Sequence, residues 1–109
     1  MALSAYKSVW LFALFDLPTH SKEHRRQYTR FRKRLLDKGF SMLQYSVYAK
    51  HMASEEAAES VKNSVRESLP PAGQVRLLAI TDHQFGRMEV FTGKKRAKTE
   101  DPPMQIALF

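Results

Sequence analysis

Cysteine is absent from this sequence of 109 residues, which excludes disulfide bonds, thiolate metal sites and a cysteine nucleophile. Long hydrophobic runs are absent as well. The longest, residues 9–15, contains seven apolar residues, whereas a membrane-spanning helix needs about 20. No charged leader with a small-residue cleavage site precedes this run. We therefore predict a cytoplasmic protein that has no membrane partner.

Acidic residues are the minority among the charged side chains. There are 11 Asp and Glu against 18 Lys and Arg, which gives a net charge of +7. This excess favours a polyanionic partner, either nucleic acid or an anionic membrane. We favour nucleic acid because the basic stretch lacks the broad apolar face of an interfacial helix, although ribosomal-type and chaperone-like basic proteins share this composition. The chain length and a hydrophobic fraction of 43% are typical of one folded domain.

The apolar run at residues 9–15 predicts a strand that is covered on both faces, because a half-exposed strand would alternate polar and apolar residues. Pro18 lacks a backbone N–H and disfavours helix at Leu17, so we expect the strand to end near Asp16. A carboxylate at the end of a buried strand is held in place, which suits a metal ligand. The alternative is a structural aspartate that accepts N–H bonds from the following loop.

A helix is predicted over residues 22–38. Ser21 is a suitable N-cap, and Gly39 is a suitable residue to end the helix in the left-handed conformation. At helical spacing, one face is apolar. It contains His24, Tyr28, Phe31 and Leu35, with Leu36 beside it. We expect this face to pack on the sheet.

The opposite face of this helix carries most of the charge of the protein. Residues 22–38 contain eight Lys or Arg and two acids, a local charge of +6. Contacts between such side chains and phosphates are independent of sequence and sensitive to salt. We predict that nucleic acid binds to Lys22, Arg25, Arg26, Arg30, Lys33 and Arg34. An ordinary solvated helix face would mix charges of both signs.

Beyond this helix, residues 40–49 alternate large side chains on both faces and predict a second strand. Ser54 is expected to cap a second helix, with Pro70 and Pro71 ending it. A third strand is predicted at residues 74–81, after Gly73.

The last part of the chain predicts a strand at residues 85–91 and a solvated linker at residues 92–103. The apolar tail at residues 104–109 is expected to add an edge strand to a sheet. We therefore predict a domain at residues 1–93, followed by a charged linker and a C-terminal strand at residues 94–109.

This order of elements favours an α+β fold of the ferredoxin-like class, a sandwich of two helices on an antiparallel sheet. The fit requires either that residues 40–49 form a hairpin-like pair or that residues 74–81 provide the fourth core strand. Residues 40–49 contain neither glycine nor proline, so we expect any bend near residues 42–44 to be a bulge.

Three ordered blocks together resemble one protein family: FALFDLP, RRQYTRFRKRLLDKGFSMLQYSVYAK and GQVRLLAITDHQFGRMEVFTG. They are similar to the small CRISPR-associated adaptation proteins of the Cas-two family, which accompany the spacer integrase. The similarity spans residues 9–93. It implies a ferredoxin-like homodimer joined through the sheets, with the C-terminal strand added to the sheet of the partner.

The resemblance also implies a function. The family is described as a metal-dependent endonuclease that acts on RNA or DNA, and as a scaffold that bridges integrase dimers. Its metal-binding aspartate corresponds to Asp16, and the tyrosine that usually precedes this aspartate is Phe15 here. One carboxylate is a poor Mg²⁺ site, but two-fold symmetry would bring a second Asp16 near the first. We expect Mg²⁺ at Asp16 to activate water for phosphodiester cleavage.

Two other functions remain compatible with the sequence. One is a non-catalytic adaptor that binds nucleic acid and the integrase, and the other is a toxin-like ribonuclease outside CRISPR immunity. The histidines do not favour a zinc enzyme, because they lack HxH or HExxH spacing. They are His20, His24, His51 and His83.

Overall fold

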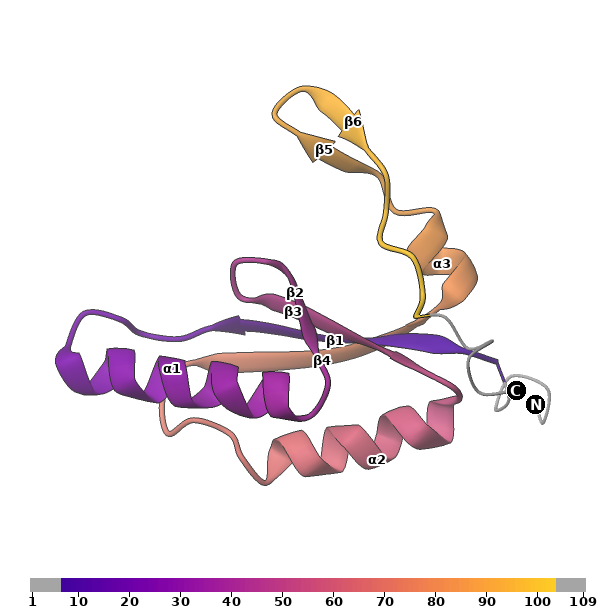
Figure 1. Ribbon diagram of the computed structural model, residues 1–109. Helices are drawn as coiled ribbons and strands as arrows, with labels where there is room; N and C mark the ends of the chain where they lie inside the picture. The colour runs from indigo at the N-terminus through magenta and orange to yellow at the C-terminus, as the bar shows by residue number, and fades with distance from the viewer. Residues whose placement is uncertain (1–6, 104–109) are drawn as a thin grey trace.

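The computed structural model describes residues 7–103, and its core is a four-stranded antiparallel sheet with two helices on one face (Figure 1). The strand order is β2-β3-β1-β4. The elements are β1 (Val9–Asp16), α1 (Lys22–Asp37), β2 (Ser41–Gln44), β3 (Val47–Met52), α2 (Glu55–Arg66), β4 (Gln74–Thr81), α3 (Asp82–Gly86), β5 (Val90–Thr92) and β6 (Lys95–Ala97). The first six follow the β-α-β-β-α-β order, which confirms the predicted ferredoxin-like α+β fold.

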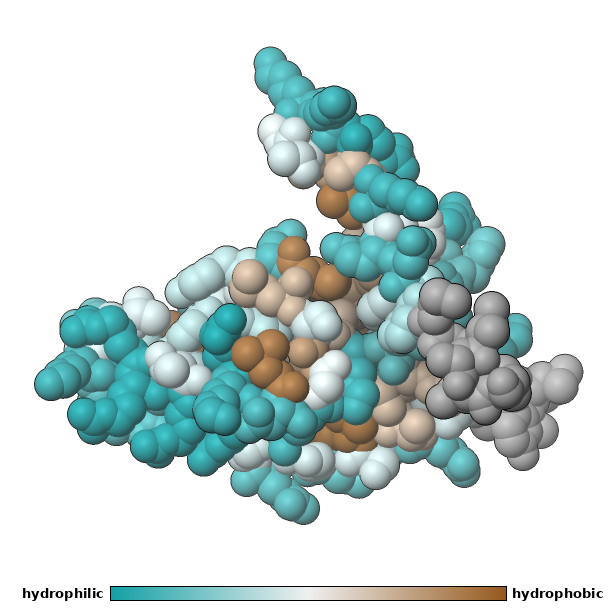
Figure 2. Space-filling view, in the orientation of Figure 1, coloured by the Kyte–Doolittle hydropathy of each residue, from teal (hydrophilic) through white to brown (hydrophobic). Residues whose placement is uncertain are grey.

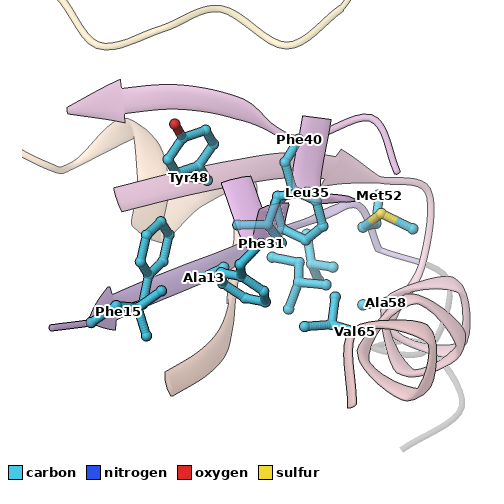
Figure 3. Packing of buried hydrophobic residues seen from close by; sticks show 12 residues of the cluster. Ala13, Phe15, Phe31, Leu35, Phe40, Tyr48, Met52, Ala58 and Val65 are labelled. Carbon is cyan, nitrogen blue, oxygen red and sulfur yellow. The ribbon is translucent and has the colours of Figure 1, made fainter. Parts of the chain in front are cut away.

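Strand β1 lies between β3 and β4, and both of its faces are buried. Side chains at alternate positions, including Ala13 and Phe15, point toward the helices and join the main core with Phe31 of α1 and Val65 of α2 (Figure 3). On the other face, Trp10 stacks on Phe85 of α3 with ring centroids 4.0 Å apart. The prediction of a strand covered on both sides is therefore confirmed, and the short helix α3 provides part of the second cover.

The helices begin where the sequence predicts. The Ser21 side chain accepts the N–H of His24 at 3.0 Å, and Ser54 accepts the N–H of Ala57 at 3.1 Å. Gly39 follows α1 with a φ of 94°, which a glycine adopts without strain. Helix α2 ends at Arg66, before the two prolines. Within residues 7–103, no helix combines the length and the hydrophobicity needed to span a membrane.

Residues 40–49 do not form a single strand; the alternative, a hairpin-like pair, is confirmed. Strands β2 and β3 form a hairpin that turns at Tyr45 and Ser46, while a register shift between Met42 and Gln44 matches the predicted bulge. Ser46 adopts the left-handed conformation with a φ of 62°, a role usually filled by Gly or Asn. The turn has no sequence signal because serine rarely takes this conformation.

The predicted strand at residues 85–91 is also wrong over its first part. Thr81 and Gln84 form a reciprocal capping box that starts α3, and the chain returns to strand only at β5. The predicted linker contains β6, which pairs with β5 across Gly93, where φ is 63°. This hairpin projects from the face of the sheet opposite α1 and α2 (Figure 1). The predicted C-terminal strand at residues 104–109 lies outside the described residues.

Candidate nucleic-acid interface and acidic site

Asp16 is the last residue of β1, and its exposed side chain lies on the face of the sheet opposite α1 and α2. It follows Phe15, which packs toward the helices, so the alternation of a strand directs Asp16 to the other face. Asp16 is paired with Gln74 of β4, and the two residues border an open pocket of about 200 Å³ together with Leu14 and Arg76. The site therefore combines one acid with one cation.

The carboxylate of Asp16 has no hydrogen-bond or ion-pair partner among residues 7–103. A structural aspartate would accept N–H groups from the loop that follows β1, and all of this loop is described. Its backbone instead continues into α1, where Ser21 acts as the cap. The geometry of the loop therefore leaves both carboxylate oxygens of Asp16 open to an external ligand.

One described chain supplies few ligands for a metal at this position. Mg²⁺ requires six oxygen ligands, several of which are usually water. No group of three or more His, Cys, Asp or Glu side chains is gathered in the described part of the chain, and Arg76 borders the same pocket as Asp16. Asp16 therefore fits a hydrated Mg²⁺ as a single carboxylate ligand, and further protein ligands would have to come from a second molecule.

The predicted basic face of α1 lines an open groove of about 490 Å³. Its residues are Lys22, Arg25, Arg26, Thr29, Arg30 and Lys33. The five cations among them are called the basic groove below. Arg26 pairs with Glu23 at 2.7 Å and Lys33 pairs with Asp37 at 3.3 Å. Both pairs are exposed, and such pairs contribute only about 0–1 kcal/mol, so these cations remain available to phosphates. Figure 2 shows the strongly hydrophilic surface over α1.

Arg34, the sixth predicted nucleic-acid ligand, is placed differently. It is half-buried, and its Nη1 donates to the backbone carbonyl of Ser68 at 3.1 Å. This bond joins the last turn of α1 to the segment after α2. The structure thus brings five of the six predicted side chains together in one groove. Among these five, Arg25 is exposed but also donates to the backbone carbonyl of Thr19 at 3.1 Å.

A tyrosine cluster at the β2–β3 turn was not predicted from the sequence. Tyr28 of α1 stacks against Tyr45 with ring centroids 5.6 Å apart and an interplanar angle of 15°. The Tyr28 hydroxyl is hydrogen-bonded to the Ser46 hydroxyl at 3.1 Å. The neighbouring Tyr28 hydroxyl raises the pKa of Tyr45 above its usual value. This pair of tyrosines could have been predicted from the sequence only if the β2–β3 turn had been recognised there.

The histidines do not form a metal site within the described residues. His51 of β3 lies 3.0 Å from Asp82 of α3 through its Nε2 atom, with its ring edge-on to Trp10 at 5.2 Å. His20 and His24 contact each other edge-on at 4.4 Å. These contacts connect neighbouring elements of the fold.

Comparison with known proteins identifies the family of this chain. The family model described as CRISPR associated protein Cas2 matches residues 9–88. A protein of Flavobacterium psychrophilum named CRISPR-associated endoribonuclease Cas2 is 47% identical over 107 residues, which cover 98% of this chain and 93% of the relative. A protein of Parvibaculum lavamentivorans with the same name is 50% identical over 101 residues, which cover 93% of this chain and all of the relative. The chain therefore belongs to the CRISPR-associated protein Cas2 family.

Proposed function

We propose that this protein acts in CRISPR adaptation as a Mg²⁺-dependent endonuclease that cleaves RNA or DNA phosphodiesters and as a scaffold for the spacer integrase. The observation that carries the proposal is the carboxylate of Asp16, which is free at the end of a buried strand. Relatives that are 47% and 50% identical are named endoribonucleases. An endonuclease also needs a surface that attracts the phosphate backbone of nucleic acid, and the basic groove provides it.

The roles of the side chains follow from their chemistry. The basic groove binds phosphates without reading base sequence. Asp16 would hold Mg²⁺, and a bound Mg²⁺ would polarise a phosphodiester and lower the pKa of a coordinated water. Arg76, which borders the same pocket as Asp16, is suited to offset negative charge on the phosphate that is attacked.

A homodimer would complete the acidic site. We place the contact on the sheet face that carries Asp16, because this face also carries apolar side chains. Leu78 lies opposite Phe12 in register and is 52% exposed. Figure 2 shows apolar surface in the hollow between the β5–β6 hairpin and the sheet. Apolar surface of this kind favours a protein partner, and a two-fold axis near Asp16 would bring two carboxylates to one metal.

A non-catalytic adaptor is the second candidate. The adaptor is favoured because one described chain places only one carboxylate, Asp16, in its pocket, and the cation of Arg76 lies beside it. Both features weaken a metal site formed by one molecule. In this function the basic groove holds nucleic acid while the integrase carries out the chemistry.

One experiment separates the two candidates. The wild type and Asp16→Ala are incubated with single-stranded RNA and with duplex DNA, in Mg²⁺ or in EDTA, and the same samples are tested for binding to the integrase. The endonuclease function predicts cleavage that requires both Asp16 and Mg²⁺. Cleavage that survives both the substitution and EDTA would contradict it. Integrase binding without any cleavage would support the adaptor.

A further inference from the structure

The β2–β3 turn presents an aromatic ring to solvent. Tyr45 is 71% exposed, the largest exposed fraction among the large apolar and aromatic side chains of the described residues. One face of its ring is covered by Tyr28, at an interplanar angle of 15°. Such an arrangement fixes the ring and leaves its second face open for stacking.

The backbone of the turn holds this ring in place at a conformational cost. Ser46 has a φ of 62°, and a non-glycine residue persists in this conformation only where its surroundings enforce it. Two contacts do so here. The Ser46 hydroxyl bonds to the Tyr28 hydroxyl at 3.1 Å, and the Ser46 carbonyl accepts the N–H of Phe15 at 3.1 Å.

These contacts place Tyr45 at the same end of the sheet as Asp16. The carbonyl of Ser46 bonds to Phe15, the residue immediately before Asp16. Figure 1 shows the β2–β3 turn and the end of β1 on the same side of the molecule. Tyr28, which supports the ring, belongs to the helix that carries the basic groove. The turn that carries Tyr45 is therefore tied both to the helix that carries the basic groove and to the strand that ends at Asp16.

We propose that Tyr45, supported by Tyr28, stacks on an unpaired base of single-stranded nucleic acid. In a duplex both faces of each internal base are covered by its neighbours, so only an unstacked base offers a free face to an aromatic side chain. The proposal rests on the proposed function in one respect, since the ligand is a nucleic acid. It adds a determinant that selects single strands over duplexes, which the basic groove does not provide.

The test compares Tyr45→Ala and Tyr45→Phe with the wild type. Affinity is measured for a short single-stranded RNA, for a duplex of the same sequence, and for the same single strand with abasic sites. Tyr45→Ala is expected to weaken single-strand binding by about 5- to 150-fold, the range for one base stacked on an aromatic side chain. Tyr45→Phe keeps the ring and is expected to bind like the wild type. Duplex binding and binding to the abasic strand are expected to be unaffected by either substitution.

A fluorescent readout reports stacking directly. A single strand that contains 2-aminopurine is expected to show quenching with the wild type and with Tyr45→Phe, but none with Tyr45→Ala. Thermal unfolding of each variant provides the folding control, since a side chain that is 71% exposed contributes little to the core.

The outcomes distinguish this inference from the proposed function. If Tyr45→Ala weakens single-strand and duplex binding equally, or changes neither, the stacking proposal is refuted while the basic groove remains supported. If Tyr45→Ala leaves nucleic-acid binding intact but abolishes binding to the integrase, the tyrosine contacts a protein and the proposal is refuted. If the wild type binds no nucleic acid at all, both the stacking site and the proposed function are refuted.

Discussion

The salt dependence of nucleic-acid binding is predicted to follow the five cations of the basic groove, and two arginines on the same helix provide a matched test. Arg30 is exposed and lines the groove, whereas Arg34 donates to the carbonyl of Ser68. Each phosphate contact contributes about −0.9 to the slope of log K against log salt for duplex DNA. Five contacts in one groove therefore predict a slope of about −4.5.

A slope of this size predicts a large loss of duplex affinity as the salt concentration rises. Raising the salt from about 50 to about 200 mM would reduce duplex affinity roughly 500-fold. Removing Arg30 with Arg30→Ala should change the slope by about +0.9. Arg34→Ala should leave the slope unchanged and instead lower stability, by about 1–3 kcal/mol, because it removes a charged hydrogen bond within the fold.

Fluorescence anisotropy of a labelled duplex, titrated at several salt concentrations, measures these slopes, and thermal unfolding measures stability. If Arg34→Ala changes the slope as much as Arg30→Ala does, Arg34 also contacts phosphate, and its bond to Ser68 does not remove it from the binding surface. If Arg30→Ala leaves the slope unchanged, the groove on α1 is not the surface that contacts phosphates.

Two further predictions concern stability, and each has a matched control. Phe85 is 2% exposed and stacks on Trp10, so Phe85→Ala should lower the free energy of unfolding by about 3–5 kcal/mol. Phe91 is 56% exposed, so Phe91→Ala should change it by no more than about 0.5 kcal/mol. Denaturant unfolding measures both. A loss for Phe91 equal to that for Phe85 would contradict the burial of α3. Gly73 has a φ of 93°, and a Cβ there would lie 2.6 Å from the carbonyl oxygen of Asp16. Gly73→Ala should therefore destabilise by about 2–5 kcal/mol, while Gly86→Ala, where a Cβ meets no atom within 4 Å, should unfold at the wild-type midpoint. Equal midpoints for these two variants would contradict the close approach at Asp16.

The elements that the sequence predicts correctly are those with local physical causes. The uninterrupted apolar run of β1 requires cover on both faces, and the cover is found on both. Ser21 and Ser54 accept the N–H groups that a helix start leaves free. The position of Asp16 follows from Pro18, which ends the strand. These patterns depend on neighbours in the sequence, so no tertiary information was needed.

The errors arise where tertiary contacts override local preference. Ser46 turns the β2–β3 hairpin because Phe15 and Tyr28 hold it, and neither contact is visible in the residues of the turn. Phe85 has a strong preference for strand, yet it lies in α3 because its ring stacks on Trp10.

The sequence predicts which residues make up the candidate site better than it predicts how these residues are arranged. The charge of α1 is evident in the sequence, but the bond from Arg34 to the carbonyl of Ser68 depends on the segment after α2, 34 residues later in the chain. The predicted strand at residues 40–49 places Tyr45 in its interior, where its ring would pack on a neighbour. Its exposure results from the turn, and the stacking site was missed for that reason.

We propose that Asp16 holds a divalent metal shared between two copies of the chain. Calorimetric titration with Mg²⁺ measures this directly, together with the mass of the protein in solution. We predict one ion for two chains, and loss of this binding in Asp16→Asn, which keeps the shape of the side chain and removes its charge. Binding of one ion to each chain that persists in Asp16→Asn, or a monomeric protein, would contradict the claim.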